Sequence, residues 1–445
     1  MTTATPERSP VPDVSGRLTV TRALSLLGGV PFLGWLLGGL AAVLAEYLFG
    51  LPLALALGLR RIPVLFGFEV MLKAPRYIPG TLVYLVLVYL IPAALVAVPT
   101  ARVTDTLAAR LLRSPALSMV VHLALLYASI HLWCGLSDYR YLVGRLALIA
   151  VMLTLSLNVV NGYMGEFSCS HPGFMALGAY TASVLTVLFF VEDDVFGAPL
   201  LPPALGPFFF PLALVAGGLV AALGALAVAI PSFRARGDYL GVITLAFTFV
   251  VKSLFENLEI VGGPRGFMNQ PNWADLPTVF AWTVVCIAVI NNFVRSTLGK
   301  ALNAVRDGEI AAEAMTVDTR RTKIVAFLFA AFWAGVAGGL FAHVVSYINP
   351  ATFGVQKLAE VLAMVYFGGL NSVIGSIAGG LGLTLFSEAL RPLEVWKWVI
   401  IPVLLVFVMA NRPTGLIAFR EFDVMKLLGP RRGRKEGSQN VCAQG

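Results

Sequence analysis

The sequence predicts an all-α protein, a polytopic transmembrane helical bundle of roughly ten spans with Gly-interrupted or re-entrant segments. Of its 445 residues, 58% are hydrophobic and 13% are charged, with a mean hydropathy of +0.84. That charged fraction is about half the usual value for a soluble chain. A helix needs about 20 apolar residues to cross the hydrocarbon core, so this content allows roughly ten spans. The apolar runs are continuous and lack the alternation of membrane strands.

The net charge of +8 does not indicate nucleic acid, because the basic residues lie between apolar runs and suit the positive-inside rule. The four cysteines have no disulfide or metal-ligand spacing. We therefore expect a lipid membrane as the surroundings, with no nucleic acid, metal or cofactor. The first 20 residues are polar and contain three prolines, and the apolar stretch after Arg22 exceeds a signal-peptide core, which predicts an uncleaved start.

Three regions are expected along the chain. Residues 1–115 form an N-terminal extension with additional membrane segments, residues 116–410 form the main membrane domain, and residues 411–445 form a basic cytoplasmic tail. In order, the extension contains an apolar stretch from Ala23 to Leu59, a basic segment from Arg60 to Arg76, a span from Ile78 to Val98, and a polar stretch from Thr100 to Arg113.

Seven spans and one interrupted region are expected in the main domain. They are Ala116–Leu136, Tyr141–Gly165, Phe174–Val191, Phe208–Pro231, Tyr239–Leu258, Pro277–Val294, Ile324–Tyr347, and a Gly-interrupted region from Glu360 to Ala410.

Loop charges predict the orientation. The loop around Glu192 is acidic and lacks basic residues, whereas the loop from Arg295 to Lys323 and the tail are rich in Lys and Arg, which places the latter two in the cytoplasm. Counting back makes the turn from Arg234 to Arg236 cytoplasmic as well. Before Gly165 a broken or re-entrant segment is expected to interrupt the count.

The loop from Arg295 to Lys323 is too polar to span and too rich in Ala, Leu and Glu to lack structure, so it predicts short surface helices. Asp307 is expected to cap the second helix, with Glu309 in its first turn. Ile310, Ala314 and Met315 form a small apolar stripe. Such a helix suits docking in a groove of a soluble partner. The alternative is a solvated linker.

A second segment, from Asn158 to Tyr180, interrupts apolar helix with Gly, Pro and polar side chains. Polar groups at membrane depth are costly unless they pair or line a wet cavity, and glycines permit a break in a helix. The candidates for a solute path are Gly165, Glu166, Ser168 and His171. The alternative is helix packing, with His171 satisfied internally.

The stretch Arg306-Asp-Gly-Glu-Ile-Ala-Ala-Glu-Ala-Met315 resembles the cytoplasmic loop of LivM-type branched-chain amino acid permeases, with Thr316 where the family usually has Gly. The resemblance implies that this loop contacts separate ATPase subunits through Glu309, Ala311, Ala312, Glu313, Ala314 and Met315. The segment ending in Gly178-Ala-Tyr180 is similar to the family's glycine-rich signature, with Ser170 for Gly and Pro172 for Ala, which favours a solute path.

Three further patches are similar to the same family. The first is Arg234-Ala-Arg-Gly-Asp-Tyr239, which leads into Thr244, a further candidate for the solute path; the alternative is a basic cytoplasmic anchor. The external loop Gly262-Gly-Pro-Arg-Gly266 could face a solute-binding protein or be an ordinary turn. The segment from Glu360 to Gly375 adds Gly368 and Gly369 to the path candidates, and Glu360 is either a structural partner or part of the rim. The resemblance covers roughly residues 116–420.

The chain lacks a Walker A motif: the Gly299-Lys300 pair is followed by Ala301, so ATP hydrolysis must occur on a partner and the chain is not expected to be an enzyme. The resemblance implies a permease subunit of an ATP-binding-cassette importer for branched-chain amino acids or related amino-acid or amide solutes, in the bacterial cytoplasmic (inner) membrane. It also implies cytoplasmic ATP-binding subunits, a second related permease subunit and an extracytoplasmic solute-binding protein.

The alternative is a self-contained secondary transporter or channel. It would need coupling or selectivity groups within the membrane, but the acidic residues of the apolar regions lie near breaks or ends. An intramembrane enzyme is disfavoured because the sequence has no His-Glu-x-x-His and its four histidines share no ligand spacing. The identity of the solute, the role of the extension and the homo- or heterodimeric nature of the permease core stay open.

Overall fold

The long apolar runs form helices, because a helix satisfies its backbone hydrogen bonds within one segment and hydrocarbon offers no other partner. The computed structural model describes residues 29–59, 62–63, 75–193, 196–233, 239–412, 414–419 and 422–430. Within these residues, nine helices are long and apolar enough to cross a membrane, and two shorter apolar helices follow near the end. The predicted all-α membrane bundle is therefore confirmed.

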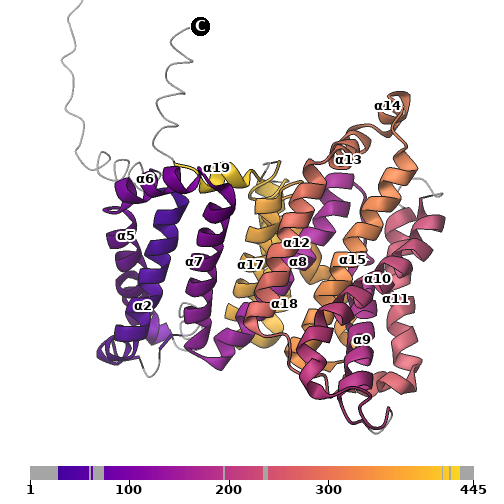
Figure 1. Cartoon of the computed structure of the whole chain (residues 1–445), viewed down its shortest axis with the longest axis horizontal. Coiled ribbons are helices and arrows are strands. Elements are labelled where there is room, and N and C mark those ends of the chain that lie inside the picture. Colours follow the sequence, from indigo (N-terminus) through magenta and orange to yellow (C-terminus); the bar gives the residue numbers. More distant parts are fainter. Residues whose placement is uncertain are drawn as a thin grey trace, which may run out of the picture. The chain divides into compact units, whose positions relative to one another are not determined.

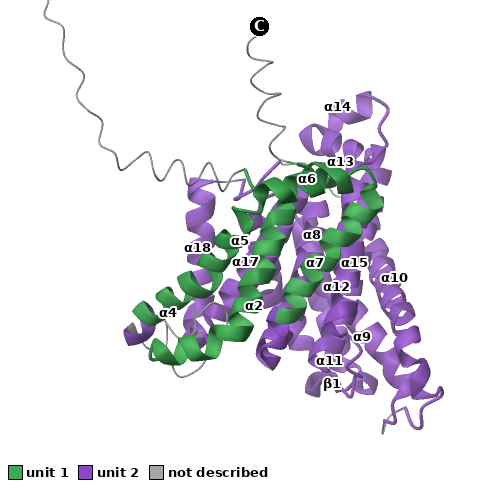
Figure 2. Ribbon diagram, turned by 60° about the vertical axis from the view of Figure 1, so that its left-hand side comes forward, with its two compact units in different colours: residues 1–62, 79–132, 423–445 green, residues 63–78, 133–422 purple. Residues whose placement is uncertain are grey.

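The chain divides into two compact units (Figure 2). Unit 1 contains residues 1–62, 79–132 and 423–445, and unit 2 contains residues 63–78 and 133–422. Each unit thus combines segments that are distant in the sequence. The three regions expected from the sequence, residues 1–115, 116–410 and 411–445, stay a prediction.

Unit 1 consists of helices from the N-terminal part of the chain and one short helix from its end. These are α2 (Phe32–Ala56), α4 (Ile78–Leu85), the π-helical turn η3 (Val86–Leu90), α5 (Ile91–Ala97), α6 (Ala101–Leu111), α7 (Pro115–Gly135) and α19 (Val424–Leu428), except that Ile78 and residues 133–135 belong to unit 2. The stretch expected only to be polar is the amphipathic helix α6, which buries Ala101, Thr104 and Ala108 at intervals of three and four residues. In α2 the buried Glu46 accepts hydrogen bonds from Tyr84 and Tyr89.

Unit 2 holds the remaining helices and a two-stranded sheet. Its α-helices are α8 (Asp138–Asn158), α9 (His171–Phe190), α10 (Gly206–Ser232), α11 (Tyr239–Asn257), α12 (Leu276–Arg295), α13 (Thr297–Asp307), α14 (Glu309–Ala314), α15 (Thr319–Val345), α16 (Val355–Gly368), α17 (Val373–Ala389) and α18 (Lys397–Asn411). Shorter elements are η2 (Pro75–Tyr77), the π-helical turn η4 (Val159–Met164), η5 (Pro203–Leu205), η6 (Glu259–Val261), η7 (Gly263–Arg265), β1 (Phe267–Met268), β2 (Tyr347–Ile348), η8 (Pro350–Phe353) and η9 (Arg391–Trp396).

Small residues bring the helices of unit 2 close together. Helices α9, α10 and α15 pack on one another, and a Cβ atom on Gly178 of α9 would overlap the backbone of Gly335 in α15. Close backbone approach of this kind is typical of membrane helices, where lipid provides no hydrophobic drive for association. Helix α8 packs against α12, α15, α16 and α17 and is almost entirely buried. It forms the centre of the unit.

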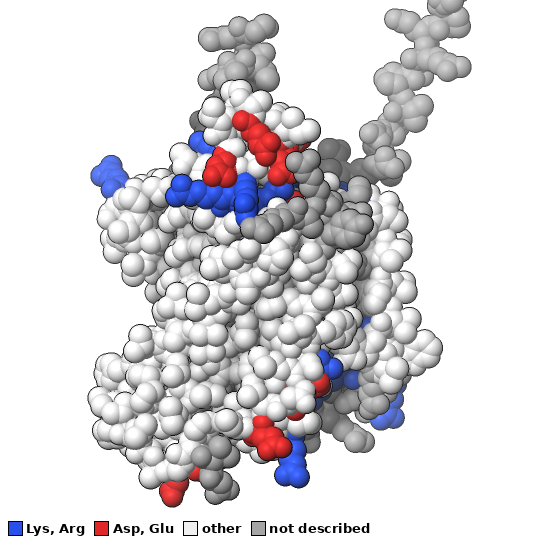
Figure 3. All heavy atoms as spheres, turned by 90° about the vertical axis from the view of Figure 1, so that its right-hand side faces the viewer, with Lys and Arg blue, Asp and Glu red and all other residues white. Residues whose placement is uncertain are grey.

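The two ends of unit 2 differ in what they carry. Helices α13 and α14 lie at one end, beyond the long spans (Figure 1). At the opposite end, β1 pairs antiparallel with β2, and Asn269 donates a hydrogen bond to Asp193 at 3.2 Å. On the face shown in Figure 3, charged side chains gather toward both ends and leave a wide uncharged belt between them. The positive-inside rule predicts that the α13–α14 end faces the cytoplasm.

Candidate functional site

A break of six residues, Gly165 to Ser170, separates η4 from α9. Gly165 has φ of +76°, a left-handed conformation that glycine adopts without a steric penalty, and it ends η4. The chain then runs without helical structure until α9 begins at His171, with Pro172 in its first turn, where a missing N–H costs no hydrogen bond. The break lies on the same side as α13, because a Cβ on Gly165 would overlap the Arg306 side chain.

Two threonines of α11 form hydrogen bonds with backbone groups of the break. The Cys169 N–H donates to Thr244 Oγ1 at 3.0 Å, and Thr248 Oγ1 donates to the Cys169 carbonyl at 2.8 Å. Ser168 N–H donates to Asn161 Oδ1 at 3.2 Å. All three supporting side chains are buried. Thr244, a candidate for the solute path, is thus engaged in fixing the shape of the break.

Asn158 connects the end of α8 to the turn between α16 and α17. Its amide nitrogen donates to Ser376 Oγ at 2.6 Å and to the Ser372 carbonyl at 3.1 Å, while its oxygen accepts from the Asn371 N–H at 3.1 Å. The two segments singled out in the sequence, around Gly165 and around Gly368, therefore meet through one buried side chain.

Gly368 and Gly369 serve close packing in this turn. A Cβ on Gly368 would overlap Gly375 in α17, and one on Gly369 would lie 2.6 Å from the Ile417 carbonyl oxygen. Gly369 has φ of +127°, and Asn371 has φ of +54°. Asparagine is one of the few residues that tolerate the left-handed region, so the turn keeps a glycine-like shape there.

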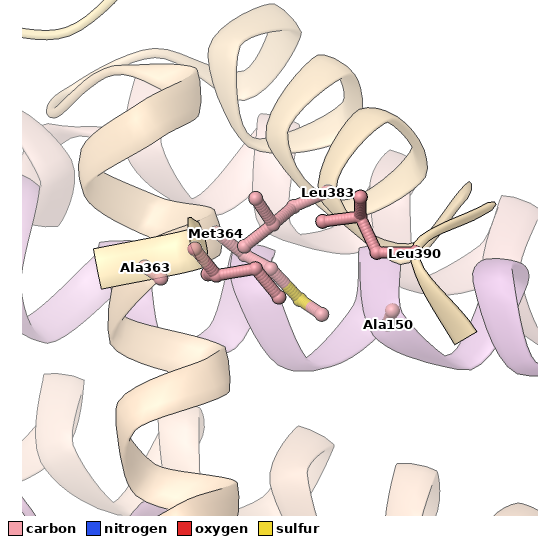
Figure 4. Close-up of a cluster of buried hydrophobic side chains, with 6 residues drawn as sticks. Ala150, Ala363, Met364, Leu383 and Leu390 are labelled. Carbon is pink, nitrogen blue, oxygen red and sulfur yellow. The ribbon is translucent and has the colours of Figure 1, made fainter. Parts of the chain in front are cut away.

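A cavity of about 750 Å³ lies among α8, α16, α17 and α18. Its walls are mainly apolar and include Ala150, Ala363 and Met364, members of a buried cluster that also contains Leu383 and Leu390 (Figure 4). The lining also contains a few charged side chains. Lys357 and Glu360 both line the cavity, and their side chains form an ion pair at 3.0 Å. Glu360 therefore has a structural partner and also lies in the cavity lining.

The cavity lining includes none of the seven residues expected along a solute path, namely Gly165, Glu166, Ser168, His171, Thr244, Gly368 and Gly369. It does include Phe167, from the middle of the break, which is 51% exposed. Ser168 and His171 are buried, and the His171 ring contacts Phe174 edge-on at 5.9 Å. The sequence analysis singled out this segment for its glycines and polar side chains and did not name Phe167, because an apolar residue between polar neighbours gives no signal of its own.

The cytoplasmic loop forms two short helices, as predicted, but their junction differs from the expectation. Asp307 was expected to cap α14; it is instead the last residue of α13, and its carboxylate pairs with Arg306 at 2.8 Å. Gly308 precedes α14 in extended conformation, without a side-chain cap. The neighbouring guanidinium attracts the Asp307 carboxylate and so removes it from the capping position. Glu309 does lie in the first turn of α14.

The surface of α14 is uneven in exposure. Ile310 and Met315 are 85% and 77% exposed, whereas Ala312 is only 4% exposed and faces its own chain. Ala311, Glu313 and Ala314 are exposed. At the end of the helix Thr316 has φ of +66°, and the Val317 N–H donates to the Ala312 carbonyl at 3.1 Å. Thr316 therefore adopts the left-handed exit for which the family usually has glycine, despite its β-branched side chain.

Helix α13 lies against η4 and Gly165, and α14 is connected to the break through Lys323 of α15. From α13, Arg306 Nη1 donates to the Gly162 carbonyl at 3.4 Å. From α14, Glu309 shares Lys323 of α15 with Glu166 of the break: Lys323 Nζ lies 2.9 Å from Glu309 and 2.7 Å from Glu166. Glu166, expected along a solute path, is thus an ion-pair partner at the end of unit 2 that carries α13 and α14.

Some sequence features lie outside the described residues. These are Arg234, Arg236, Gly237 and Asp238 of the predicted turn, Asp194 of the acidic loop, most of the basic segment from Arg60 to Arg76, the first 28 residues, and the tail beyond Pro430. Among the residues that are described, no group of three or more His, Cys, Asp or Glu side chains has an arrangement that could hold a metal ion.

The loop Gly262–Gly266, predicted to lie on the external side, is a compact turn. Gly262, Gly263 and Gly266 all have positive φ, and the loop leads directly into β1. Tyr347 donates to the Arg265 carbonyl at 3.0 Å, and Asn349 donates to the Pro264 carbonyl at 3.2 Å. The start of the connection between α15 and α16 therefore holds the glycine turn in place.

The structure is a bundle of membrane-crossing helices that line a cavity. Two short helices, α13 and α14, extend beyond the spans and are connected to a break in the bundle. This arrangement defines a multi-pass membrane permease. Residues 142–409 match the family described as branched-chain amino acid transport system, permease component. This match covers more than half of the chain, and the protein belongs to this family.

Individual relatives agree with the family. The chain is 31% identical to the high-affinity branched-chain amino acid transport system permease protein LivM of Escherichia coli K12, over 62% of this chain and 69% of that protein. It is 30% identical to the LivM protein of Salmonella typhimurium LT2, over 66% and 73%. The probable LivM protein of Methanocaldococcus jannaschii is 24% identical, over 60% and 89%. No solved structure matches the chain significantly.

Proposed function

We propose that this protein is the permease subunit of an ATP-driven importer for branched-chain amino acids, or for related small amino-acid or amide solutes, in the bacterial cytoplasmic membrane. It pairs with a second related permease, receives solute from an extracytoplasmic binding protein and is driven by separate cytoplasmic ATPase subunits. The similarity to LivM proteins supports the transport role.

The observation that carries the ATP-driven part of the proposal is the exposure of α14. Two large apolar side chains, Ile310 and Met315, stand almost fully in solvent at the cytoplasmic end, on a helix that is tied to the break through Lys323. Large apolar side chains exposed near both ends of such a short helix favour docking to a protein partner over a solvated linker. The chain itself has no phosphate-binding Gly-rich loop, so the ATP site belongs to that partner.

The cavity supports the solute class. Its volume of about 750 Å³ falls within the usual range for small-molecule sites, and its apolar walls suit an aliphatic side chain. Lys357 and Glu360, in its lining, offer a positive and a negative group to a zwitterion. We propose that Phe167 and Tyr366 mark the cytoplasmic part of this path, and that the glycine turn at Gly262–Gly266 faces the binding protein.

The proposal is tested by reconstituting the permease pair with its ATPase subunits in proteoliposomes and adding the binding protein outside. Radiolabelled leucine, isoleucine and valine serve as probes. We expect accumulation that requires ATP inside the vesicles and the binding protein outside. A secondary transporter would instead accumulate solute without ATP and lose uptake when ionophores collapse the ion gradients. ATP-independent uptake by this chain alone would overturn the proposal.

A second measurement concerns the chain by itself. Purified without partners, it should hydrolyse no ATP above the level of an empty detergent control. Robust hydrolysis that persists after removal of contaminating ATPases would contradict the assignment of the ATP site to a partner.

A further inference from the structure

Three charged side chains from three separate elements meet at the cytoplasmic end of unit 2. Glu309 opens α14, Lys323 lies in the second turn of α15, and Glu166 lies in the break. The lysine nitrogen is within 3 Å of one carboxylate oxygen from each glutamate, at 2.7 Å for Glu166 and 2.9 Å for Glu309. One cation thus joins the exposed loop helix to the break.

Lys323 lies at a position where a positive charge without ion-pair partners would be unfavourable. It is 8% exposed, and it lies near the N-terminus of α15, where the helix dipole disfavours a positive charge. Burying a cation costs free energy unless opposite charges compensate for the lost water. The two glutamates are more exposed, with side chains 28% and 49% accessible, so each can return to water more readily than the lysine can.

We propose that Lys323 is a positioning residue that transmits movement of α14 to the break, so that ATP hydrolysis on the docked partner changes the shape of the segment carrying Phe167. This inference rests on the proposed function, because it assumes an ATPase docked on α14. The direct neighbour of Glu166 in the chain is Phe167, which lines the cavity. Displacement of α14 therefore moves Lys323 through its ion pair with Glu309. Lys323 in turn moves Glu166, and the movement of Glu166 reorients Phe167.

A second contact keeps α14 and α15 in register without reaching the break. Thr319 Oγ1 donates to Glu313 at 2.9 Å, one turn before Lys323. Loss of Lys323 should therefore leave the loop folded and able to bind the ATPase, while the connection to Glu166 is cut. The predicted defect is uncoupling, rather than loss of assembly.

The test uses the full transporter in proteoliposomes and measures both ATP hydrolysed and leucine accumulated. In Lys323→Met we expect the ATPase to stay bound and active, while leucine moved per ATP falls about tenfold, a typical size for coupling between two sites. Lys323→Arg should retain the wild-type ratio. The matched control is Lys252→Met, which removes the 3.5 Å ion pair with Glu256 within the single helix α11 and should leave the ratio unchanged.

Charge reversal separates coupling from simple structural support. The triple variant Glu166→Lys, Lys323→Glu and Glu309→Lys restores both ion pairs with opposite signs, and it should regain most of the coupling ratio. If Lys323→Met does not assemble, Glu166→Gln and Glu309→Gln test the proposal instead, because each variant leaves Lys323 with one carboxylate partner. Both variants should lower the amount of leucine moved per ATP.

The outcomes are distinct. A wild-type complex without ATP-dependent leucine uptake would refute the proposed function itself. The role of Lys323 alone would be overturned if the wild-type complex transports leucine and Lys323→Met moves as much leucine per ATP as the wild type. The same conclusion would follow if both glutamine variants kept the wild-type ratio of leucine to ATP. Failure of the triple variant to recover any coupling, when it assembles and hydrolyses ATP, would likewise show that the ion pairs are not the link.

Discussion

The side-chain oxygen of Asn158 accepts a hydrogen bond from the backbone N–H of Asn371 at 3.1 Å, across 213 residues of sequence. Asn158 ends α8, and Asn371 lies in the left-handed turn between α16 and α17. The same side chain donates to Ser376 and to the Ser372 carbonyl. The two polar interruptions of the membrane domain are therefore one buried hydrogen-bonded unit.

Asn158→Ala should destabilise this unit. Asn158 is 1% exposed, and its loss removes the bonds to Ser372 and Ser376 and takes the printed partner from the Asn371 N–H, which commonly costs about 1–3 kcal/mol. The expected result is a lower midpoint of thermal unfolding in detergent, with reduced uptake. Asn257→Ala is the control, because Asn257 is exposed and bonds only within its own helix. Equal midpoints for the two variants would contradict the role of Asn158.

Gly165→Ala should disturb the contact between the break and α13. The left-handed backbone costs a residue with a Cβ about 1–2 kcal/mol, and the new methyl group would overlap Arg306 Cγ. We expect lower thermal stability and reduced transport, with partial recovery in Gly165→Ala combined with Arg306→Ala. Gly382→Ala in α17 is the control, since its Cβ would meet only Phe367 at an ordinary 3.7 Å. A fully active, fully stable Gly165→Ala would show that the close contact is dispensable.

Phe167→Cys should react with small water-soluble thiol reagents, and the rate of this reaction should change while leucine is being transported. Phe167 is half exposed and lines the cavity, whereas Phe174 is buried and Phe174→Cys should stay inert. Cys134, Cys169 and Cys286 are buried. Burial also raises the pKa of the Cys169 thiol, so less reactive thiolate is present.

The background for this experiment is Cys442→Ser, which removes the cysteine outside the described residues. Ser168→Cys provides a second comparison: Ser168 is fully buried, so its labelling should require turnover. Inert Phe167→Cys in an active transporter would place the solute path elsewhere.

Met315→Asp should weaken association with the ATPase without unfolding the permease. Truncations at the centre of an interface often cost about 2 kcal/mol or more, and a charge there should cost at least as much. That corresponds to roughly thirtyfold weaker binding, measurable by titrating ATPase onto the permease in detergent. Met268→Asp, at the external β1 strand with 55% exposure, is the matched control and should bind ATPase normally.

Ala312→Arg is expected to behave differently from Met315→Asp. Ala312 is packed against its own chain, so the arginine should lower the stability of the loop as well as ATPase binding. If both variants bound ATPase and transported leucine at wild-type levels, the docking role of α14 would be refuted and the solvated linker would stand.

Individual residues of the loop show which structural features the sequence predicts and which it does not. The loop from Arg295 to Lys323 was predicted to hold two short helices and does, since composition and helix propensity act locally. The cap at Asp307 was predicted wrongly, because its carboxylate had a competing neighbour in Arg306. The burial of Ala312 was not predictable, since the apolar stripe of a six-residue helix does not specify which face meets the rest of the chain.

The sequence by itself determined the membrane class, the helical architecture and the approximate ends of the spans, because backbone hydrogen bonding in hydrocarbon is satisfied within each segment and depends only on the local length of apolar runs. Only the tertiary structure decided that Lys323 joins Glu166 to Glu309, that Thr244 and Thr248 hold Cys169, and that Phe167 faces the cavity. These relationships join residues brought together by close helix packing, and the packing depends on how small residues fit between helices, which no local pattern specifies.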